Sequence, residues 1–216
     1  MQKIKALFVV ERSVQMVTRE RNPEAEWVFN GDGVATIKYD GTPALIKDGI
    51  LYKRWNRALQ KKHVRAWKRS DKTELPPIEH FKEPPAGAIA LENKPADVTL
   101  HFPYWVPVTA EDKFFNIAFE ELTVKADGTY ELVGPKIQGN MYELDSYQLW
   151  KHGTETIEIN DYSFDGLRAL FSNLNAEGIV WHRPNGDMIK LRRSHFNFDW
   201  KDDPRNDKTA RDNFKP

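Results

Sequence analysis

The side chains best suited to chemistry in this sequence are a lysine and an aspartate two positions apart, Lys38 and Asp40. They follow the apolar run 34–37, whose alternation predicts a β-strand that Gly41 and Pro43 then break. Residues i and i+2 of a strand share a face, so both side chains are predicted to point the same way. A deprotonated lysine amine attacks phosphorus or carbon, which makes Lys38 a candidate nucleophile. The same short pattern also occurs in ordinary strand–turn segments.

A second group of charged side chains lies on a predicted hairpin near the other end of the chain. The segments 178–182 and 188–192 flank a Pro-Asn-Gly turn and alternate as two short strands. Lys190 and Arg192 then share one face, and the apolar residues between them face the other way. Transfer of a nucleotidyl group requires a metal ion and cations around the α-phosphate, so Glu177 is a candidate metal ligand and the two cations are candidate phosphate clamps. The alternative is an ordinary hairpin with charges on its wet face.

Four segments in this order carry a family resemblance. They are Lys38-Tyr-Asp-Gly41, Glu131-Leu-Val-Gly134, Glu177-Gly-Ile-Val-Trp181 and Lys190-Leu-Arg192. Together they resemble motifs I, III, IV and V of the covalent nucleotidyltransferase superfamily, which contains ATP-dependent ligases and capping enzymes. The longer segments 130–140, 149–153 and 177–192 most resemble a small ATP-dependent RNA ligase family that includes the vertebrate 5′ to 3′ RNA ligase.

The resemblance implies a role for each matching side chain. Lys38 would become covalently adenylylated, and Asp40 would help to hold the nucleotide and the lysine. Glu131 would hydrogen-bond a ribose hydroxyl. Glu177 would bind the metal ion, and Lys190 would contact the α-phosphate.

Several further residues are expected near the nucleotide. Ile37, next to the nucleophile, and Arg54, which closes a neighbouring strand, are assigned to nucleotide binding. Arg192 is assigned there too, although many relatives carry lysine at this position and a planar guanidinium differs from a point charge. Tyr147 and Trp150 are candidates for an aromatic that stacks on adenine, or are core residues.

A basic stretch favours a nucleic-acid partner although the net charge is zero. No acidic residue occurs from Lys53 to Arg69, and Trp55 and Trp67 are interleaved with the cations. We expect a strand over 50–55 followed by a helix, with contacts to phosphates and stacking on bases. A solvated charged face is the alternative. The residues assigned to nucleic-acid binding are Lys53, Arg57, Lys61 and Lys62.

Other segments are expected to support this site. The proline-rich segment 70–107 is interpreted as a long insertion that crosses the surface as a lid. The segments 111–122 and 165–174 predict helices with apolar faces in the core. Glu120 and Glu121, which resemble a metal pair, are interpreted as solvated charges at the end of the first helix.

Composition limits the class of protein. The absence of cysteine excludes disulfides, thiolate zinc sites and cysteine nucleophiles. The apolar run 6–10 is too short for a signal peptide and is interpreted as a strand. We expect a soluble, cytoplasmic protein, with a viral or phage origin left open. A single nucleotidyltransferase domain is expected over 1–200, followed by a polar tail over 201–216 that is too short for an oligonucleotide-binding barrel.

These inferences combine into one expectation. The fold class is α+β, with twisted antiparallel sheets and a few helices. The resemblance implies an ATP-dependent RNA ligase that forms a lysyl-AMP intermediate and uses Mg²⁺ or Mn²⁺ to join RNA 5′-phosphate and 3′-hydroxyl ends, as in RNA repair. No obligate protein partner and no membrane contact is inferred. A DNA ligase, a GTP-using capping enzyme and a non-catalytic RNA-binding module of the same fold remain alternatives.

Overall fold

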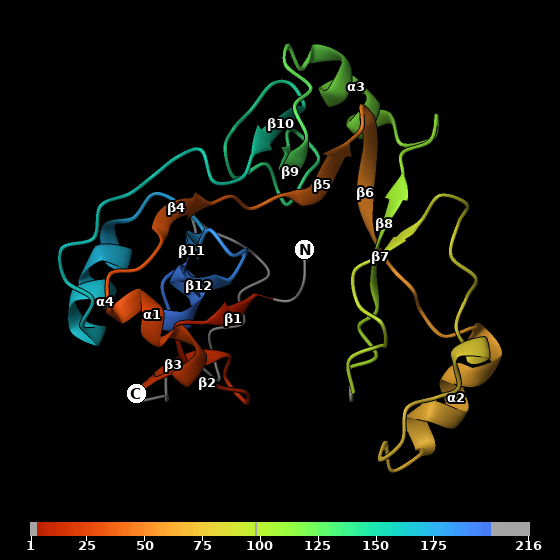
Figure 1. The fold of residues 1–216 in the computed structure, drawn as a ribbon, viewed down its shortest axis with the longest axis horizontal. Coiled ribbons are helices and arrows are strands. Elements are labelled where there is room, and N and C mark those ends of the chain that lie inside the picture. The colour runs from red at the N-terminus through yellow and green to blue at the C-terminus, as the bar shows by residue number, and fades with distance from the viewer. Residues whose placement is uncertain (1–3, 98, 200–216) are drawn as a thin grey trace. The chain divides into compact units, whose positions relative to one another are not determined.

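The computed structural model describes residues 4–97 and 99–199, which fall into two compact units (Figure 1). Unit 1 holds residues 42–97, 99–132 and 146–150, and unit 2 holds residues 4–41, 133–145 and 151–199. The single domain expected over 1–200 remains a prediction. The polar tail expected over 201–216 lies outside the described residues.

The central sheet of unit 2 joins strands from both ends of the sequence. Its order is β1 (Lys5–Ala6), β12 (Met188–Arg192), β11 (Gly178–His182) and β4 (Val34–Lys38). β11 pairs antiparallel with both β12 and β4, whereas β1 runs parallel to β12. The predicted strand before the nucleophile and the predicted hairpin are therefore confirmed, and they are neighbours in one sheet.

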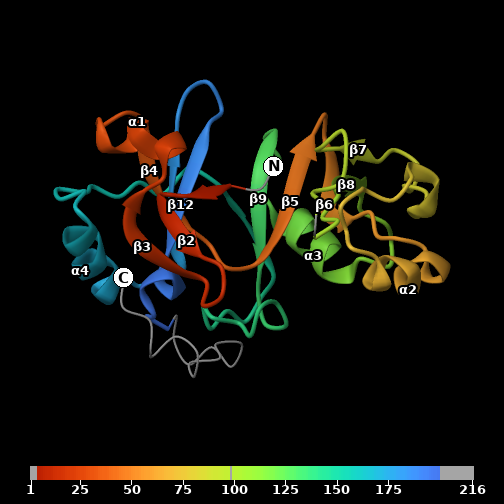
Figure 2. The same cartoon turned by 90° about the horizontal axis from the view of Figure 1, so that it is seen from below.

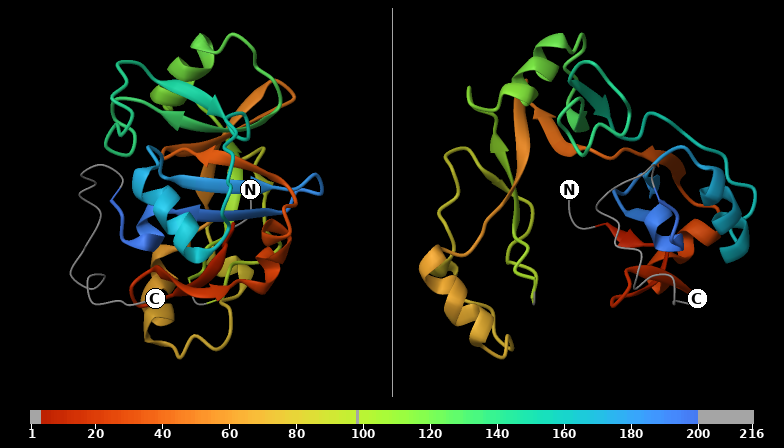
Figure 3. Two further views of the ribbon diagram at one scale, coloured as in Figure 1. Left: turned by 90° about the vertical axis from the view of Figure 1, so that its left-hand side faces the viewer. Right: turned by 180° about the vertical axis from the view of Figure 1, so that it is seen from behind.

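Helix α4 (Phe164–Asn173) packs on this sheet through one shared apolar cluster. Its Leu167 and Phe171 are fully buried together with Ile179 and Leu191 of the hairpin, and Figure 3 shows the cyan helix against the blue hairpin. Ser163 caps the helix by accepting a hydrogen bond from the Gly166 N–H. The helix predicted over 165–174 is thus confirmed. The remaining elements of unit 2 are β2 (Phe8–Glu11), β3 (Met16–Arg21), η1 (Pro23–Ala25), α1 (Glu26–Phe29) and η3 (Arg193–Phe196).

Unit 1 is built on a six-stranded sheet. Its order is β10 (Gln148–Lys151), β9 (Gly128–Val133), β5 (Thr42–Lys47), β6 (Ile50–Asn56), β8 (Pro103–Pro107) and β7 (Ile89–Ala90). β5 pairs antiparallel with β6 and β9, as Figure 2 shows. The strand predicted over 50–55 is confirmed as β6. The expectation that Pro43 helps to end a strand is wrong, because Pro43 lies within β5. The pairing of β5 with β6 begins only at Ala44, so the missing N–H of Pro43 interrupts no hydrogen bond to β6.

The helices of unit 1 lie at the surface. α2 (Lys61–Arg69) follows β6 and has no buried residue, and α3 (Lys113–Glu121) buries only Ala118. Both helices were predicted, but the apolar face of α3 is only partly covered. Phe114 of α3 stacks on Tyr147 with ring centroids 4.3 Å apart. Glu120 and Glu121 are exposed, as expected.

The expectation that 70–107 is only a surface insertion is wrong. β8 lies within the sheet, and its Tyr104, Trp105 and Val106 are buried. The short helix η2 (Ile78–His80) leads into Phe81, which is fully buried. A strand buried on both faces shows no polar alternation, so its sequence pattern lacks the usual period of two.

The α+β class with several antiparallel sheets and few helices is confirmed by the described residues. No sheet in this part of the chain closes into a barrel. None of the helices in the described residues has the length and apolar character needed to cross a bilayer.

Candidate active site

Strand pairing in unit 2 brings Lys38 and Glu177 together. Lys38 is the last residue of β4 and lies opposite Gly178, the first residue of β11. Glu177 therefore precedes the pairing partner of Lys38, and its carboxylate forms an ion pair with the Lys38 Nζ. The two side chains are 24% and 17% exposed, so the pair is largely shielded but reachable from solvent.

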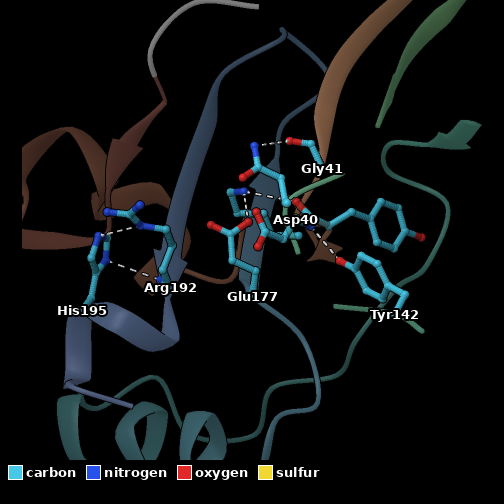
Figure 4. Close-up of polar contacts among 9 residues, drawn as sticks. Asp40, Gly41, Tyr142, Glu177, Arg192 and His195 are labelled. Atoms are coloured by element: carbon cyan, nitrogen blue, oxygen red, sulfur yellow. Dashed lines mark hydrogen bonds and ion pairs between the residues drawn. The ribbon is translucent and has the colours of Figure 1, made fainter. Parts of the chain in front are cut away.

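Gly178 is required by the close approach of the strands at this point. A Cβ atom at Gly178 would lie 2.2 Å from the Leu191 carbonyl oxygen and 3.0 Å from the Arg192 Cα. Gly178 pairs with Lys38 on one side and with Arg192 on the other. Since paired residues of a sheet share a face, the side chains of Lys38 and Arg192 lie on the same face with only a glycine between them. Figure 4 shows Glu177 beside Arg192 in this region.

The alternation predicted for β12 is confirmed. Ile189 and Leu191 are 3% and 0% exposed in the core of unit 2, whereas Lys190 and Arg192 are only partly buried on the other face. Lys190 pairs with Val180, two residues along β11 from Gly178. The face that carries Lys38 therefore also carries two cations of β12.

Arg192 is oriented by His195, a residue that no sequence pattern singled out. The Arg192 Nε donates to the His195 Nε2 at 3.1 Å, and His195 is only 2% exposed (Figure 4). His195 lies in η3, the turn that directly follows β12. Because His195 accepts the hydrogen bond from Nε, the terminal nitrogens of the Arg192 guanidinium are the groups that would bind an anion.

Asp40 lies two residues beyond Lys38, where strand β4 ends. The role expected for its side chain remains a prediction. The Asp40 backbone N–H donates to the Tyr142 hydroxyl at 2.6 Å, and the Gln138 side-chain amide donates to the Gly41 carbonyl at 3.3 Å (Figure 4). Two side chains of the segment 133–145 thus hold the backbone that follows Lys38 in place. These contacts were not predicted from the sequence.

Ile37 and His182 lie on opposite faces of the central sheet of unit 2. Ile37 pairs with Ile179, on the face opposite to Lys38, and its N–H donates to the Glu155 carbonyl at 2.8 Å. The His182 Nε2 lies 2.9 Å from the Thr36 hydroxyl on the Lys38 face, and burial lowers the pKa of His182, with nearby His152 adding to the effect. The side chain of Ile37 therefore lies on the opposite face of the sheet from the side chain of Lys38. A nucleotide bound at Lys38 would have to reach that opposite face to contact Ile37.

Two predicted nucleotide contacts share a face of the sheet in unit 1. Ala44 of β5 pairs with Lys53 and with Tyr130, so Arg54 and Glu131, each one residue further on, both face the opposite side. Glu131 is 5% exposed. Burial lowers the pKa of Arg54, an effect that Glu92 partly offsets, and its guanidinium lies 5.5 Å from the Trp105 ring.

The four predicted nucleic-acid contacts divide into two kinds. Lys61 and Lys62 are exposed on α2. Lys53 forms an ion pair with Asp112, just before α3. Arg57 is 8% exposed, and its Nε donates to the Lys82 carbonyl at 2.7 Å, which favours a structural role over contact with RNA.

The two candidates for stacking on adenine are both engaged within unit 1. Phe114 covers one ring face of Tyr147. The Trp150 Nε1 donates to the Gln148 Oε1 at 2.8 Å. Neither contact tests the expected stacking on adenine.

The donor set around Lys38 fits a magnesium ion that is held mainly by phosphates. Among the described residues no group of three or more His, Cys, Asp or Glu side chains is arranged to hold a metal. Mg²⁺ commonly uses one or two carboxylates with water and substrate phosphates. Glu177 supplies one carboxylate beside the cations of β12.

Comparisons with known proteins point to one class, the RNA ligases. Residues 107–211 match the family model of RNA ligase 1. RNA ligase 1 of Rattus norvegicus is 30% identical over 158 residues, covering 54% of this chain and 47% of that protein. RNA ligase 1 of Pongo abelii is 29% identical over 144 residues, covering 50% and 44%.

The chain spans about half the length of the curated relatives it matches, at 47% and 44% of the first two. The matched region 107–211 includes Glu131, Glu177, Lys190 and Arg192, whereas Lys38 lies before it. The predicted resemblance to a small RNA ligase family is thereby confirmed.

Proposed function

We propose that this protein is an ATP-dependent RNA ligase that works through a lysyl-AMP intermediate on Lys38. The observation that carries the proposal is the Lys38–Glu177 ion pair on a sheet face that also bears Lys190 and Arg192. The similarity to proteins named RNA ligase 1 supports RNA as the polynucleotide. A cytoplasmic setting and a role in RNA repair belong to the same proposal.

In the first step the Lys38 Nζ attacks the α-phosphorus of ATP. A nitrogen–phosphorus bond forms, the bond from the α-phosphorus to the bridging oxygen breaks, and pyrophosphate leaves. Glu177, which accepts a hydrogen bond from Nζ, would take the amine proton. Lys190 and Arg192 would stabilise the charge on the non-bridging oxygens. Mg²⁺ or Mn²⁺, when bound, would neutralise part of the phosphate charge, with Glu177 as its protein ligand.

The next two steps move AMP and then join the RNA. An oxygen of the RNA 5′-phosphate attacks the AMP phosphorus, which forms a phosphoanhydride and releases Lys38. The RNA 3′-hydroxyl then attacks the phosphorus of the 5′-phosphate, which forms the phosphodiester and releases AMP. The same cations serve each step because each displaces a leaving group at phosphorus.

The remaining residues would bind and orient the substrates. Glu131 would hydrogen-bond a ribose hydroxyl, and Arg54, on the same sheet face, would contact a phosphate. Asp40 would hold the nucleotide beside Lys38. Lys61 and Lys62 are the exposed cations proposed for the RNA backbone.

Labelled ATP tests this function directly. Protein is incubated with ATP labelled at the α-phosphate and Mg²⁺, and then with single-stranded RNA that carries a 5′-phosphate and a 3′-hydroxyl. The label is expected first on the protein, then on the RNA 5′ end, and finally in free AMP as joined RNA accumulates. Labelling by GTP alone, or sealing of nicked DNA but not of RNA, would contradict the proposal. RNA binding without any label on the protein would favour a non-catalytic module.

A further inference from the structure

A cavity of about 560 Å³ lies beside α2, within unit 1. This volume falls in the range of about 300–1,000 Å³ that is typical of small-ligand sites. No residue of the four motifs contributes to it. Its walls are His63, Ala66, Trp67 and Ser70 on or next to α2, the loop residues Asp71, Thr73, Glu74, Leu75, Pro76 and Pro77, and His80 of η2.

Three of the residues that line this cavity carry flat rings: His63, Trp67 and His80. The rings of His63 and His80 stack with centroids 3.7 Å apart and an angle of 8° between their planes. Trp67 and Leu75 also pack against the buried cluster around Phe81, which fixes their positions. Aromatic and imidazole faces held in place are the kind of surface on which a nucleobase stacks.

The charges around the cavity are divided between its interior and its edge. Asp71 and Glu74 line the cavity, so a phosphate inside it would be repelled. The exposed cations Lys62 and Arg69 lie four residues before and three residues after Ala66, so all three share one side of the helix. The positive charge therefore lies next to the cavity and not within it.

Asp71 adds a fixed acceptor. Its Oδ1 accepts hydrogen bonds from the Thr73 backbone N–H at 3.1 Å and from the Thr73 hydroxyl at 2.9 Å, which holds the carboxylate in place. Carboxylates accept hydrogen bonds from the exocyclic amino groups of bases. The chemistry of the wall thus matches a base, and the chemistry of the edge matches phosphates.

We propose that this cavity, the α2 pocket, receives one unpaired base of single-stranded RNA while the neighbouring phosphates lie on Lys62 and Arg69. The base must be unpaired because a base within a duplex is stacked and cannot enter. The identification of the ligand as RNA rests on the proposed function. The proposal itself concerns binding and requires no ATP.

Two oligonucleotides separate base docking from attraction by phosphates. One is single-stranded RNA, and the other is an abasic analogue with the same number of phosphates. Their dissociation constants are measured by fluorescence anisotropy with the full chain and without ATP. Ala66→Trp is chosen to fill the pocket, because Ala66 lines it and is not a core residue, and Ala169→Trp, at an exposed position of α4, is the matched control.

Wild-type protein and Ala169→Trp are expected to bind RNA at least about five-fold more tightly than the abasic analogue. A five-fold difference in affinity is about the smallest effect expected from the stacking of one base. Ala66→Trp is expected to abolish this difference. Replacing Lys62 and Arg69 by alanine should weaken both oligonucleotides and lower the salt dependence of binding. Equal affinity of wild type for both oligonucleotides, no binding of either, or an undiminished difference in Ala66→Trp would overturn the proposal.

The outcome is independent of adenylylation. If the protein acquires no AMP but its preference for base-bearing RNA is lost in Ala66→Trp, the proposed ligase function fails and the α2 pocket stands. If AMP is acquired and Ala66→Trp keeps the preference, the ligase function stands and the pocket proposal fails.

Discussion

The ammonium group of Lys38 and the carboxylate of Glu177 form an ion pair although 139 positions separate them in the sequence. The pairing of β4 with β11 creates this contact, because Lys38 lies opposite the residue that follows Glu177. A charged nucleophile and a proton acceptor are therefore held together by backbone hydrogen bonds and not by a flexible loop.

Replacing Glu177 by glutamine should remove the negative charge beside Lys38 with little change in shape. We expect the rate of protein adenylylation to fall by a factor on the order of 10² or more, the size of effect seen when one electrostatic group is removed from an active site. The measurement is the initial rate of label incorporation from ATP. Glu158→Gln, at an exposed position of the same unit, is the control. A rate like that of wild type would exclude Glu177 from the chemistry.

Replacing Gly178 by alanine should distort the sheet at the site. The added Cβ would meet the backbone of Leu191 and Arg192, which cannot move away as a side-chain end can. We expect a loss of about 1–3 kcal/mol in the free energy of unfolding, the usual cost of overpacking. Urea denaturation measures it. Gly31→Asn, at an open position where asparagine tolerates the positive φ, should cost clearly less. Equal losses would mean that the strand contact is not tight.

Replacing Arg57 by alanine should reveal a structural residue. Its guanidinium donates to the Lys82 carbonyl and lies 5.5 Å from the Phe102 ring, so its loss leaves a partly buried acceptor without its donor and removes a buried side chain. We expect unfolding to become easier by about 2 kcal/mol. Arg65→Ala, on the exposed side of α2, should change stability by no more than about 0.5 kcal/mol. An Arg57→Ala protein of unchanged stability but weaker RNA binding would restore the original assignment to nucleic-acid binding.

The lowered pKa of His182 predicts a dependence of stability on pH. Burial is the main cause of this lowered pKa, because it disfavours the charged imidazolium. His182 in the folded protein therefore takes up its proton at a lower pH than in the unfolded chain, where its pKa is about 6.5. The unfolded chain therefore binds more protons than the folded chain as pH falls through 6.5, and stability decreases toward acidic pH. Urea denaturation between pH 7.5 and pH 5 should show a shallower decrease for His182→Gln than for wild type. Identical slopes would show that His182 does not contribute.

The elements with a clear periodicity were predictable. The alternation in β12 places Ile189 and Leu191 in the core and Lys190 and Arg192 on the other face, as expected. The apolar spacing of α4 likewise identified Leu167 and Phe171 as inward. These patterns are visible because each element has one buried and one solvated face.

Other features depended on tertiary packing. β8 is buried on both faces and is bounded by prolines, so it lacks alternation and resembles a loop. Arg57 belongs to a run of cations, and nothing in that run distinguishes the one side chain that is buried. His195 contacts Arg192 only because a 3-10 turn follows β12 directly. Local sequence carries no signal for such contacts.

The intact mass of the full chain after incubation with ATP and Mg²⁺ tests the central claim most directly. Wild-type protein is expected to gain the mass of one AMP. Lys38→Arg, which keeps the positive charge beside Glu177, is expected to gain none, whereas Lys47→Ala, at an exposed position, should behave like wild type. The absence of an adduct on folded wild-type protein, or an AMP adduct on Lys38→Arg, would contradict the assignment of Lys38 as the nucleophile.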